Sequence, residues 1–430
     1  MSSKRFGLLG ETLGHSHSPW IHAHFGYDYR LYPVSLTQLE DWVRQRALDG
    51  YNVTMPYKRT VMPWLDHLSA QAEAIGVVNT VVKRDGLLYG FNTDYLGMTY
   101  ALQRAGINVT NRNVLILGTG ATAQTALFVC RRQHANHVAM VSRRPEAAAI
   151  TRPLPCPIVS YEQANLQNAS VVINTTPVGL FPNNGARVLS LADFTHLEGV
   201  LDVIFNPLVT DLQAQAQSLG IPTAYGLDML VMQALAARDL FTGKAVDDNL
   251  VLNDALCQEA EALTQALRLH VSNVVLVGMP GCGKSTVGPL VARLLDKRFV
   301  DTDAALEEAT GQTIPTLFAT QGQAAFRRQE ADLVRTLGAG QGGVVATGGG
   351  VVLDPANYLP LKQNGFIVHL VRDVDLLPLT NRPLSQSRGA LQAMWAQREP
   401  LYNAFADARV PNQGTPAETA QSIVHLFMKS

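Results

Sequence analysis

Short apolar runs alternate with helix-like apolar spacing along almost the whole chain, and this alternation predicts an α/β protein. Runs such as Phe6–Leu9 and Asn52–Thr54 have the length and composition of buried strands. Val77–Lys83 and Leu87–Phe91 are predicted to form a hairpin around Asp85-Gly86, because Asp-Gly favours a two-residue turn. The chain is therefore expected to build sheets covered by helices.

The same pattern divides the chain into three successive blocks. Residues 1–103 mix strands with helices such as Leu36–Leu48. Residues 104–235 begin a second α/β block at the apolar run Asn113–Leu117, and residues 236–267 are helical, ending in the alanine-rich segment Asp254–Leu267. Residues 271–430 form the third block, which opens with the apolar run Asn273–Val277.

Composition and charge narrow the class of protein. The 430 residues are 47% hydrophobic, which allows a substantial core, and the net charge is −1 with no basic block. Bulk electrostatic binding to nucleic acid or an anionic membrane is therefore not expected. The apolar runs fall well short of the roughly 18–20 residues that a membrane helix needs, and the N-terminal run is interpreted as a first strand instead of a signal peptide. Four widely spaced cysteines without a C-x-x-C pair favour a reducing cytoplasm.

A glycine-rich turn follows the predicted strand Val114–Leu117 and precedes the predicted helix Gln124–Arg132. It reads Gly118-Thr-Gly120-Ala121-Thr-Ala123, the pattern of a dinucleotide-binding turn that brings pyrophosphate to a helix N-terminus. An ordinary strand–turn–helix packed by small residues is the structural alternative.

The strand after this turn indicates which dinucleotide is bound. Val138–Val141 ends in Ser142-Arg143-Arg144, about 20 residues after the glycines, where an NAD site usually carries an acidic residue. Two guanidinium groups suit the 2′-phosphate of NADP instead, although they are also compatible with a solvated loop.

Several polar residues of the first block are candidates for a substrate site. Ser16 and Ser18 are two apart and would face one side of an extended segment, where both could bind one carboxylate, but Ser18-Pro19 also fits a helix cap. Thr54 and Lys58 are predicted at a strand end, and Lys58 would serve as a proton donor if partly buried, although such a lysine is more often on the surface. Asp94 either pairs with it or caps a helix.

A second glycine loop, Gly278–Thr286, fits the phosphate-binding pattern G-x-x-x-x-G-K-[ST] between a predicted strand and the predicted helix Val287–Leu295. Its backbone N–H groups are expected to surround phosphate, with Lys284 reaching the β/γ-phosphates and Ser285 coordinating Mg²⁺. Cys282 is either a reactive thiol or, more simply, a loop filler. The residues assigned to ATP in this loop are Gly281, Cys282, Gly283, Lys284, Ser285 and Thr286.

Acidic and basic residues after this loop suggest a small anionic acceptor. Asp301 and Asp303 end the strand Phe299–Val300 and are predicted to share one face; one would serve Mg²⁺ and the other would take a substrate proton, with a helix cap as the alternative for Asp303. Further candidates are Arg327 and Arg398, together with the triplet Gly348–Gly350, whose glycines would let a ligand approach. Arg382 is a last candidate, because it lies beside a possible lid, Ser385–Gly389. Each arginine alone is more often solvated than functional.

The first two blocks resemble shikimate dehydrogenase. The motifs that carry the resemblance recur in order: Gly14-His-Ser-His-Ser-Pro19, Asn52-Val-Thr-Met-Pro-Tyr-Lys58, Val78-Asn79-Thr80, Asn92-Thr-Asp94, Asn174-Thr-Thr-Pro-Val-Gly179 and Gly226–Gln233. The resemblance implies a substrate-binding domain of residues 1–103 and 236–267 and a Rossmann NADP-binding domain of residues 104–235. It implies Lys58 and Asp94 as the catalytic pair. It also implies a substrate site of Ser16, Ser18, Thr54, Asn79, Asp94 and Gln233, and a cofactor site that includes Asn174 and Thr175. By the same resemblance, Asn174–Gly179 lies by the nicotinamide side of the cofactor, and Phe205 lies where substrate and nicotinamide meet.

Residues 271–430 resemble shikimate kinase, a P-loop domain with a central parallel sheet between helices. The resemblance implies that Asp303 accepts the proton of the hydroxyl that is phosphorylated, that Ser285 and Asp301 hold Mg²⁺ and that Arg382 covers the ATP phosphates. It implies a shikimate site of Asp303, Arg327, Gly349, Gly350 and Arg398.

Together the two resemblances predict a bifunctional shikimate-pathway enzyme that uses NADPH, ATP and Mg²⁺. Three positions depart from the families: Phe205 where tyrosine is usual, Ala121 where a third glycine is common, and Gln323 where glutamate is frequent, which predicts a loss of local charge pairing. Two alternatives stay open. One half, more readily the dehydrogenase, is an inactive regulatory module, or the kinase acts on another small carboxylated alcohol.

Overall fold

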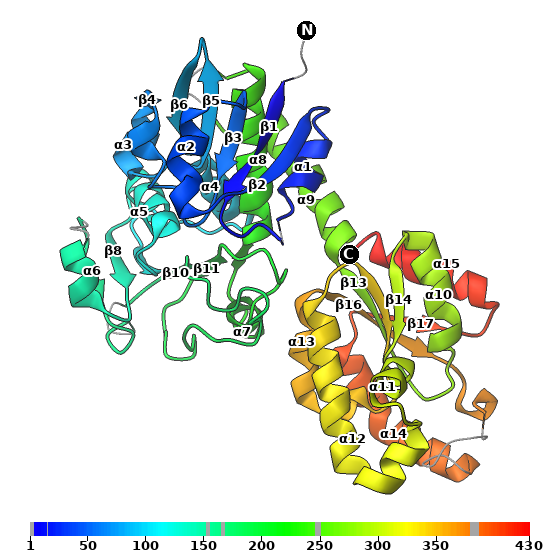
Figure 1. The fold of residues 1–430 in the computed structure, drawn as a ribbon. Coiled ribbons are helices and arrows are strands. Elements are labelled where there is room, and N and C mark those ends of the chain that lie inside the picture. The colour runs from blue at the N-terminus through cyan, green and yellow to red at the C-terminus, as the bar shows by residue number, and fades with distance from the viewer. Residues whose placement is uncertain (1–3, 15, 152–154, 165–167, 246–250, 379–386) are drawn as a thin grey trace. The chain divides into compact units, whose positions relative to one another are not determined.

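A computed structural model describes residues 4–14, 16–151, 155–164, 168–245, 251–378 and 387–430. The chain folds into two compact units, drawn in Figure 1. Unit 1 comprises residues 1–178, 187–205 and 212–267, and unit 2 comprises residues 179–186, 206–211 and 268–430. Two short segments of the predicted nucleotide block therefore fold with the C-terminal unit.

The first sheet of unit 1 is mixed and has the strand order β2-β1-β3-β5-β6-β4. Its strands are β1 (Arg5–Gly10), β2 (Asp28–Pro33), β3 (Gly50–Val53), β4 (His67–Leu68), β5 (Thr80–Arg84) and β6 (Leu87–Phe91). The predicted hairpin is confirmed, since β5 and β6 pair antiparallel and Asp85 and Gly86 both have positive φ in the turn. The helices of this part are α1 (Ser18–Ala23), α2 (Leu39–Arg44), α3 (Ala70–Ile75) and α4 (Asp94–Arg104).

The second sheet of unit 1 is parallel throughout and has the order β12-β11-β10-β7-β8-β9. Its strands are β7 (Asn113–Leu117), β8 (His137–Val141), β9 (Ile158–Val159), β10 (Val171–Asn174), β11 (Gly199–Asp202) and β12 (Thr223–Tyr225). This is the doubly wound order of a dinucleotide-binding fold, with the topological switch between β7 and β10. The helices are α5 (Ala121–Arg132), α6 (Pro145–Thr151), α7 (Asp211–Ser218), α8 (Gly226–Thr242) and α9 (Asp254–Val271), the last of which continues past the end of unit 1.

Unit 2 has a five-stranded parallel sheet of order β14-β15-β13-β16-β17. The strands are β13 (Asn273–Val277), β14 (Arg298–Asp301), β15 (Gly343–Ala346), β16 (Gly365–Val371) and β17 (Ala408–Pro411). Its helices are α10 (Lys284–Leu295), α11 (Thr302–Thr310), α12 (Ile314–Ala339), α13 (Tyr358–Gln363), α14 (Arg388–Phe405) and α15 (Pro416–Phe427). Helices α10 and α15 pack together on one face and α12 and α13 on the other, as Figure 1 shows.

The α/β prediction is confirmed, and the strands that open the glycine loops begin and end where the apolar runs do. One predicted helix is wrong: Leu36–Leu48 is a 3₁₀ turn, Leu36–Gln38, followed by the short helix α2. Arg46 has a left-handed backbone, with φ of 50°, which stops the helix before the apolar pattern ends. Within the described ranges, no helix is both long and apolar enough to cross a membrane.

Candidate active sites

The first site is centred on a buried ion pair. Lys58 Nζ donates to Asp94 Oδ2 at 2.6 Å, and the side chains are only 14% and 7% exposed. Asp94 is the first residue of α4, but Thr93 occupies the cap position and no side-chain cap bond forms there. The capping interpretation of Asp94 is therefore wrong, because its carboxylate faces Lys58 instead of the helix N-terminus. An ammonium held in this way can transfer a proton to a substrate oxygen.

Asn79 orients the second oxygen of Asp94. Its Nδ2 donates to Asp94 Oδ1 at 2.8 Å, to Thr93 Oγ1 at 3.0 Å and to Gln233 Oε1 at 3.5 Å, and its Oδ1 accepts from Thr93 N at 2.6 Å. The three partner residues, Thr93, Asp94 and Gln233, are all buried, so these bonds fix the carboxylate of Asp94 against rotation. Among the residues assigned to catalysis or to the substrate, Asp94 thus contacts both Lys58 and Asn79, and Asn79 also contacts Gln233.

The serine motif lies at the start of α1, with a geometry that differs from the one predicted. His17, between the two serines, has αR backbone angles, so the segment is not extended. Ser18 is the first helical residue and His17 occupies the cap position, so the cap interpretation is also displaced by one residue. Ser16 Oγ instead accepts from Ser18 N at 3.2 Å, which leaves the hydroxyl groups near each other through a turn.

A chain of buried hydrogen bonds links Ser18 to the ion pair. Burial raises the pKa of Tyr29, whereas a hydrogen bond with Ser18 lowers it. Tyr29 Oη donates to Asn52 Oδ1 at 2.8 Å, Asn52 Nδ2 donates to Thr80 Oγ1 at 3.0 Å, and Thr80 Oγ1 donates to Asn79 Oδ1 at 3.2 Å. The predicted strand-end residue Thr54 follows β3 directly, and its backbone N–H donates to Leu9 O at 2.9 Å.

The glycine turn of the second sheet lies at the topological switch point. Gly118 has a φ of 105°, and Gly120 is the extended cap residue before α5, which begins at Ala121. A Cβ on Gly120 would meet no atom within 4 Å, so the space before the helix N-terminus is open to a ligand. These features fit a bound pyrophosphate, for which the first-turn N–H groups of α5 are donors.

Asn174 ends the neighbouring strand β10, and Thr175 follows it beside the same turn. Thr175 Oγ1 donates to Leu117 O at 2.7 Å and would lie 3.0 Å from a Cβ on Gly118. The Asn174 side chain makes its hydrogen bonds within the protein: it donates to Asp202 Oδ1 at 3.0 Å and accepts from Thr176 N at 3.0 Å. Its contribution to a cofactor site is therefore to shape the backbone of the loop.

Ser142, Arg143 and Arg144 follow β8 and line a cavity of ≈ 530 Å³. Both arginines are exposed, and Arg144 N donates to Ser142 Oγ at 3.1 Å. Two guanidinium groups beside a cavity at the end of the second strand fit a phosphate on the adenosine ribose.

The second site begins with the loop after β13. Gly278, Gly281 and Gly283 all have positive φ, which makes the loop possible without strain. Lys284 is buried, and its Nζ donates to the carbonyl oxygens of Gly278 at 2.8 Å and Met279 at 3.0 Å, with Cys282 Sγ at 3.7 Å. The glycine loop encloses a buried ammonium group, and this arrangement fits an anionic phosphate.

Ser285 and Asp301 are brought together at the mouth of the loop, where Ser285 Oγ donates to Asp301 Oδ2 at 2.5 Å. Asp301 also caps α11 by accepting from Asp303 N at 3.0 Å, so the cap predicted for Asp303 belongs to Asp301. The shared strand face is wrong as well, since β14 ends at Asp301 and the helix starts at Thr302. Among the described residues no group of three or more His, Cys, Asp or Glu side chains is placed to hold a metal. A hydroxyl and one carboxylate nevertheless suit Mg²⁺, which takes few protein ligands and completes its shell with phosphate and water.

Asp303 lies in the first turn of α11, and its carboxylate is close to the glycine triplet. Burial raises the pKa of Asp303 above its ordinary value of 3.8, the charge of Asp301 raises it further, and Lys284 and Arg327 lower it. A Cβ on Gly348 would come within 2.8 Å of Asp303 Oδ1. This carboxylate is therefore placed to accept a proton more readily than an exposed aspartate.

The two arginines of the predicted acceptor site lie on either side of the same triplet. Arg327 Nη1 donates to Glu330 Oε2 at 2.5 Å, and Arg398 Nη1 donates to Gly349 O at 2.9 Å. The Nε atoms of both arginines are buried and have no partner among the described residues. Two orphaned guanidinium donors fit a carboxylate on a small acceptor.

The triplet Gly348–Gly350 is glycine because of the protein's own packing. A Cβ on Gly349 would lie 2.6 Å from Pro280, and one on Gly350 would overlap Arg327. The loop and Arg327 therefore impose a steric requirement for glycine, and the close approach of a ligand to this backbone stays a prediction. Arg382 and the first two residues of the proposed lid lie outside the described residues, and the rest of that segment, residues 387–389, forms the cap and start of α14.

Three residues that the sequence did not single out complete the second site. Glu330 pairs with Arg327, Tyr402 Oη donates to Gly349 O at 2.5 Å, and Asn412 Nδ2 donates to Cys282 O at 2.7 Å. The i, i+3 spacing of Arg327 and Glu330 and the i, i+4 spacing of Arg398 and Tyr402 were available signals. The expected loss of charge pairing at Gln323 does not occur at Arg327, because Glu330 supplies the carboxylate and Gln323 is exposed.

Comparisons with known proteins match both parts of the chain. A family model described as the shikimate dehydrogenase substrate binding domain matches residues 8–81, and the shikimate kinase family model matches residues 280–427. A shikimate dehydrogenase (NADP(+)) of Clostridium perfringens is 36% identical over 255 residues, which cover 57% of this chain and 94% of that protein. One from Methanococcus maripaludis is 32% identical over 263 residues, with the same coverage.

Solved structures match the same part of the chain. A chorismate mutase/shikimate 5-dehydrogenase fusion protein from Clostridium acetobutylicum is similar at 29% identity with a TM-score of 0.56, over 62% of this chain and 98% of that chain. Shikimate 5-dehydrogenase from Thermus thermophilus, in complex with NADP(H) and shikimate, is 31% identical with a TM-score of 0.52, over 61% and 99%.

Proposed function

The chain belongs to the shikimate dehydrogenase family and also carries a shikimate kinase domain, and from this premise we propose which of its residues perform each reaction. The protein is a bifunctional enzyme of the shikimate pathway. It reduces 3-dehydroshikimate to shikimate with NADPH and phosphorylates shikimate to shikimate 3-phosphate with ATP and Mg²⁺. The product of the first reaction is the substrate of the second.

The observation that carries the first assignment is the buried Lys58–Asp94 pair. When bound, NADPH supplies the hydride that reduces the ketone carbon. We assign proton donation at the ketone oxygen to Lys58 Nζ, because Asp94 holds that ammonium at 2.6 Å and Asn79 fixes the carboxylate in turn. Ser16, Ser18, Thr54 and Gln233 would hold the rest of the substrate.

The cofactor would lie across the switch point of the second sheet. Gly118 makes the tight turn, Gly120 and Ala121 offer backbone N–H groups for the pyrophosphate, and Arg143 and Arg144 offer guanidinium groups for the 2′-phosphate. This last contact supports NADP over NAD, since an unphosphorylated ribose gives the two arginines no anionic partner.

The second reaction is assigned to the loop after β13 and the residues that surround the glycine triplet. When bound, ATP with Mg²⁺ supplies the phosphoryl group. Lys284 would stabilise its charge, Ser285 and Asp301 would hold the metal, and Asp303 would take the proton from the acceptor hydroxyl. Arg327 and Arg398 would bind the acceptor carboxylate, which also argues against an uncharged alcohol as substrate.

Partners and location follow from charge and thiols. A net charge of −1 supports the proposal that only small molecules, and neither nucleic acid nor a membrane surface, are recognised. All four cysteines are free thiols, which supports a reducing compartment such as the cytoplasm.

One coupled assay tests both assignments. With 3-dehydroshikimate, NADPH and ATP-Mg, the wild-type chain should form shikimate 3-phosphate. Lys58→Ala should stop NADPH consumption but still phosphorylate added shikimate, whereas Lys284→Ala should accumulate shikimate. A Lys58→Ala chain that reduces the ketone at the wild-type rate contradicts the dehydrogenase assignment. The alternative of an inactive regulatory half, which the intact Lys58–Asp94 pair disfavours, would be revived if the wild-type chain did not consume NADPH with 3-dehydroshikimate.

A further inference from the structure

The covalent path of the chain differs from that of two domains joined by one linker. The division into units requires the chain to pass between them five times, after Val178, Ala186, Phe205, Asp211 and Leu267. The first four passages create two short segments, residues 179–186 and 206–211, that belong by sequence to the nucleotide-binding block but fold as part of unit 2. We call them the two crossover segments.

Both crossover segments continue from the proposed nicotinamide side of the dehydrogenase. Segment 179–186 follows the loop that begins at Thr175, directly after β10 ends at Asn174. Segment 206–211 follows Phe205, just beyond the neighbouring strand β11. The two strands are adjacent and parallel, so both loops leave the same edge of the sheet. Whatever restrains these segments therefore restrains residues only a few bonds from the proposed site.

Two backbone N–H groups of segment 206–211 donate hydrogen bonds to residues of unit 2 that lie outside the crossover segments. Leu208 N donates to Asn364 Oδ1 at 2.9 Å, and Val209 N donates to Gln363 O at 2.9 Å. Leu208 and Asn364 are 5% and 2% exposed, so these bonds are sheltered from water. A buried amide whose acceptor is removed would be left unsatisfied, which makes the contact specific.

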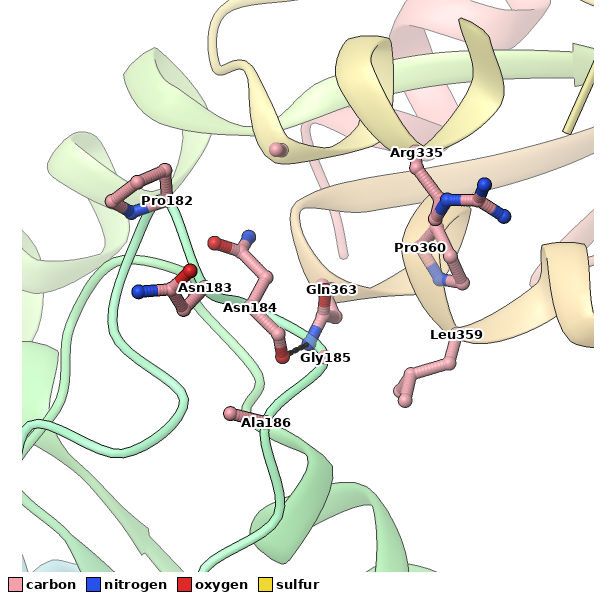
Figure 2. A pocket seen from close by; sticks show the side chains of 10 residues that line it. Pro182, Asn183, Asn184, Gly185, Ala186, Arg335, Leu359, Pro360 and Gln363 are labelled. Carbon is pink, nitrogen blue, oxygen red and sulfur yellow. Dashed lines mark hydrogen bonds between the residues drawn. The ribbon is translucent and has the colours of Figure 1, made fainter. Parts of the chain in front are cut away.

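Segment 179–186 is held at the same place. Gln363 Nε2 donates to Asn184 O at 2.8 Å, the dashed bond in Figure 2, beside a cavity of ≈ 340 Å³. Phe181 N donates to Asn206 O at 3.0 Å, which joins the two segments to each other. Gln341 Nε2 adds a contact to Asn206 Oδ1 at 3.3 Å.

The receiving residues are firmly placed. Asn364 precedes β16, its Nδ2 donates to Gly338 O of α12 at 3.1 Å, and its backbone O accepts from Asn273 N at the start of β13 at 2.7 Å. Asn364 thus ties α12 to the strand that leads into the phosphate-binding loop. It sits at the amino end of that strand, whereas the phosphate-binding loop follows its carboxyl end.

We propose that Gln363 and Asn364 form a docking site through which the kinase sequence positions the two crossover segments, and thereby the nicotinamide side of the dehydrogenase. This inference rests on the proposed dehydrogenase function. Gln363 and Asn364 are positioning residues, since they act on cofactor binding through the loops that contain Asn174, Thr175 and Phe205. The influence runs from the kinase sequence to the dehydrogenase reaction, and phosphorylation of shikimate does not depend on it.

The test compares Gln363→Ala and Asn364→Ala with Lys362→Ala in the full-length chain. Lys362 is the neighbouring residue on α13, and its ammonium pairs with Asp407 instead of a crossover segment. Three quantities are measured: KM and kcat of the dehydrogenase for NADPH, KM and kcat of the kinase for ATP, and hydrogen–deuterium exchange of the amides in segment 206–211.

Both docking variants should raise the KM for NADPH by roughly 10-fold, because small displacements of positioning groups have effects of this order. Exchange at Leu208 and Val209 should accelerate in Asn364→Ala, while kinase constants and the Lys362→Ala chain stay at wild-type values. If Asn364→Ala loses kinase activity through misfolding, Gln363→Ala provides the deciding test, because this substitution removes one side-chain hydrogen bond, the one to Asn184 O.

Unchanged NADPH kinetics in a docking variant whose kinase is active would overturn the proposal. Equal losses in both activities would also overturn it, because that result indicates a general folding role. A failure of the underlying function has a different signature, namely that the wild-type chain does not oxidise NADPH at all.

Discussion

Asp303 is the residue whose environment most directly suggests a chemical role. Burial and the neighbouring Asp301 raise the pKa of its carboxyl, while Lys284 and Arg327 oppose that shift. A carboxylate with a raised pKa is a better base toward a hydroxyl than an exposed one. The same environment makes the ionised form of Asp303 destabilising, so the feature that favours catalysis lowers the free energy of unfolding.

Asp303→Asn should therefore lower kinase kcat by roughly 10²- to 10⁴-fold, the usual range for loss of a general base. It should also raise the free energy of unfolding at pH 7, because the folded state binds the Asp303 proton more tightly than the unfolded chain and ionisation costs stability above both pKa values. Chemical denaturation and initial rates measure the two effects. Glu308→Gln, on the exposed face of the same helix, serves as the control. Lower stability in Asp303→Asn would contradict the argument.

His22 is the second residue whose titration is predictable. It is fully buried, stacks on Tyr29 with ring centroids 3.8 Å apart and shares a 2.7 Å hydrogen bond with Tyr27 through Nδ1. Burial, followed by the charge of Arg238, lowers the pKa of His22 from 6.5 to about 3. A folded-state pKa below the unfolded value means that acid favours the unfolded chain.

The stability of the chain should accordingly fall as the pH decreases from 6.5 toward 3, with His22 contributing about 1.4 kcal/mol for each pH unit in that window. His22→Phe keeps a ring against Tyr29 and should remove this component of the pH dependence. His24→Phe, two residues along on the exposed side of α1, should leave it in place. Denaturation curves at pH 7, 5.5 and 4.5 check the slopes, and identical slopes for wild type and His22→Phe would refute the assignment.

At the scale of elements, the phosphate-binding loop is supported from behind by the segment between β17 and α15. Asn412 Nδ2 donates to Cys282 O at 2.7 Å, and Asn412 Oδ1 accepts from Thr419 Oγ1 at 2.9 Å. Gly283 has a φ of 106° and would overlap Asn412 if it carried a Cβ. The loop is thus shaped by a distant part of the sequence that touches it only in the folded state.

Asn412→Ala should loosen this support and raise the KM of the kinase for ATP by about 10-fold, the order of effect expected when groups that position a ligand shift. The dehydrogenase constants should not change. Gln421→Ala removes an exposed amide side chain of α15 in the same unit and is the matched control. Wild-type ATP kinetics in a destabilised Asn412→Ala chain would show that the contact serves folding alone.

The elements also show how much of the structure could be predicted from the sequence. The strands before both glycine loops were predictable, because an apolar run bounded by glycine has few alternatives. Asn412, Tyr402 and Glu330 were not singled out, since their partners are distant in sequence or become adjacent only once a helix forms. The contact between Lys58 and Asp94 was likewise not predictable from spacing: the two residues are 36 positions apart, and only the pairing of β3, β5 and β6 brings them within 2.6 Å.

For the whole molecule, the crossover segments bear on cooperativity. Two domains joined by one linker can unfold independently, whereas this chain passes between its units five times. Unfolding of either unit must release segments whose ends are fixed in the other. We therefore expect the dehydrogenase and kinase activities to be lost in one thermal transition.

Ligand linkage tests this expectation. NADP at 100 times its Kd stabilises the folded chain by about 2.7 kcal/mol if it binds only that state. In a single cooperative system this free energy is shared, so NADP should protect kinase activity as well as dehydrogenase activity during heating. Residual activities after timed incubation, with and without NADP, measure the effect. Protection should persist in Lys58→Ala, which lacks the proposed proton donor but keeps the cofactor turn. Protection confined to the dehydrogenase would mean that the units unfold independently despite their shared segments.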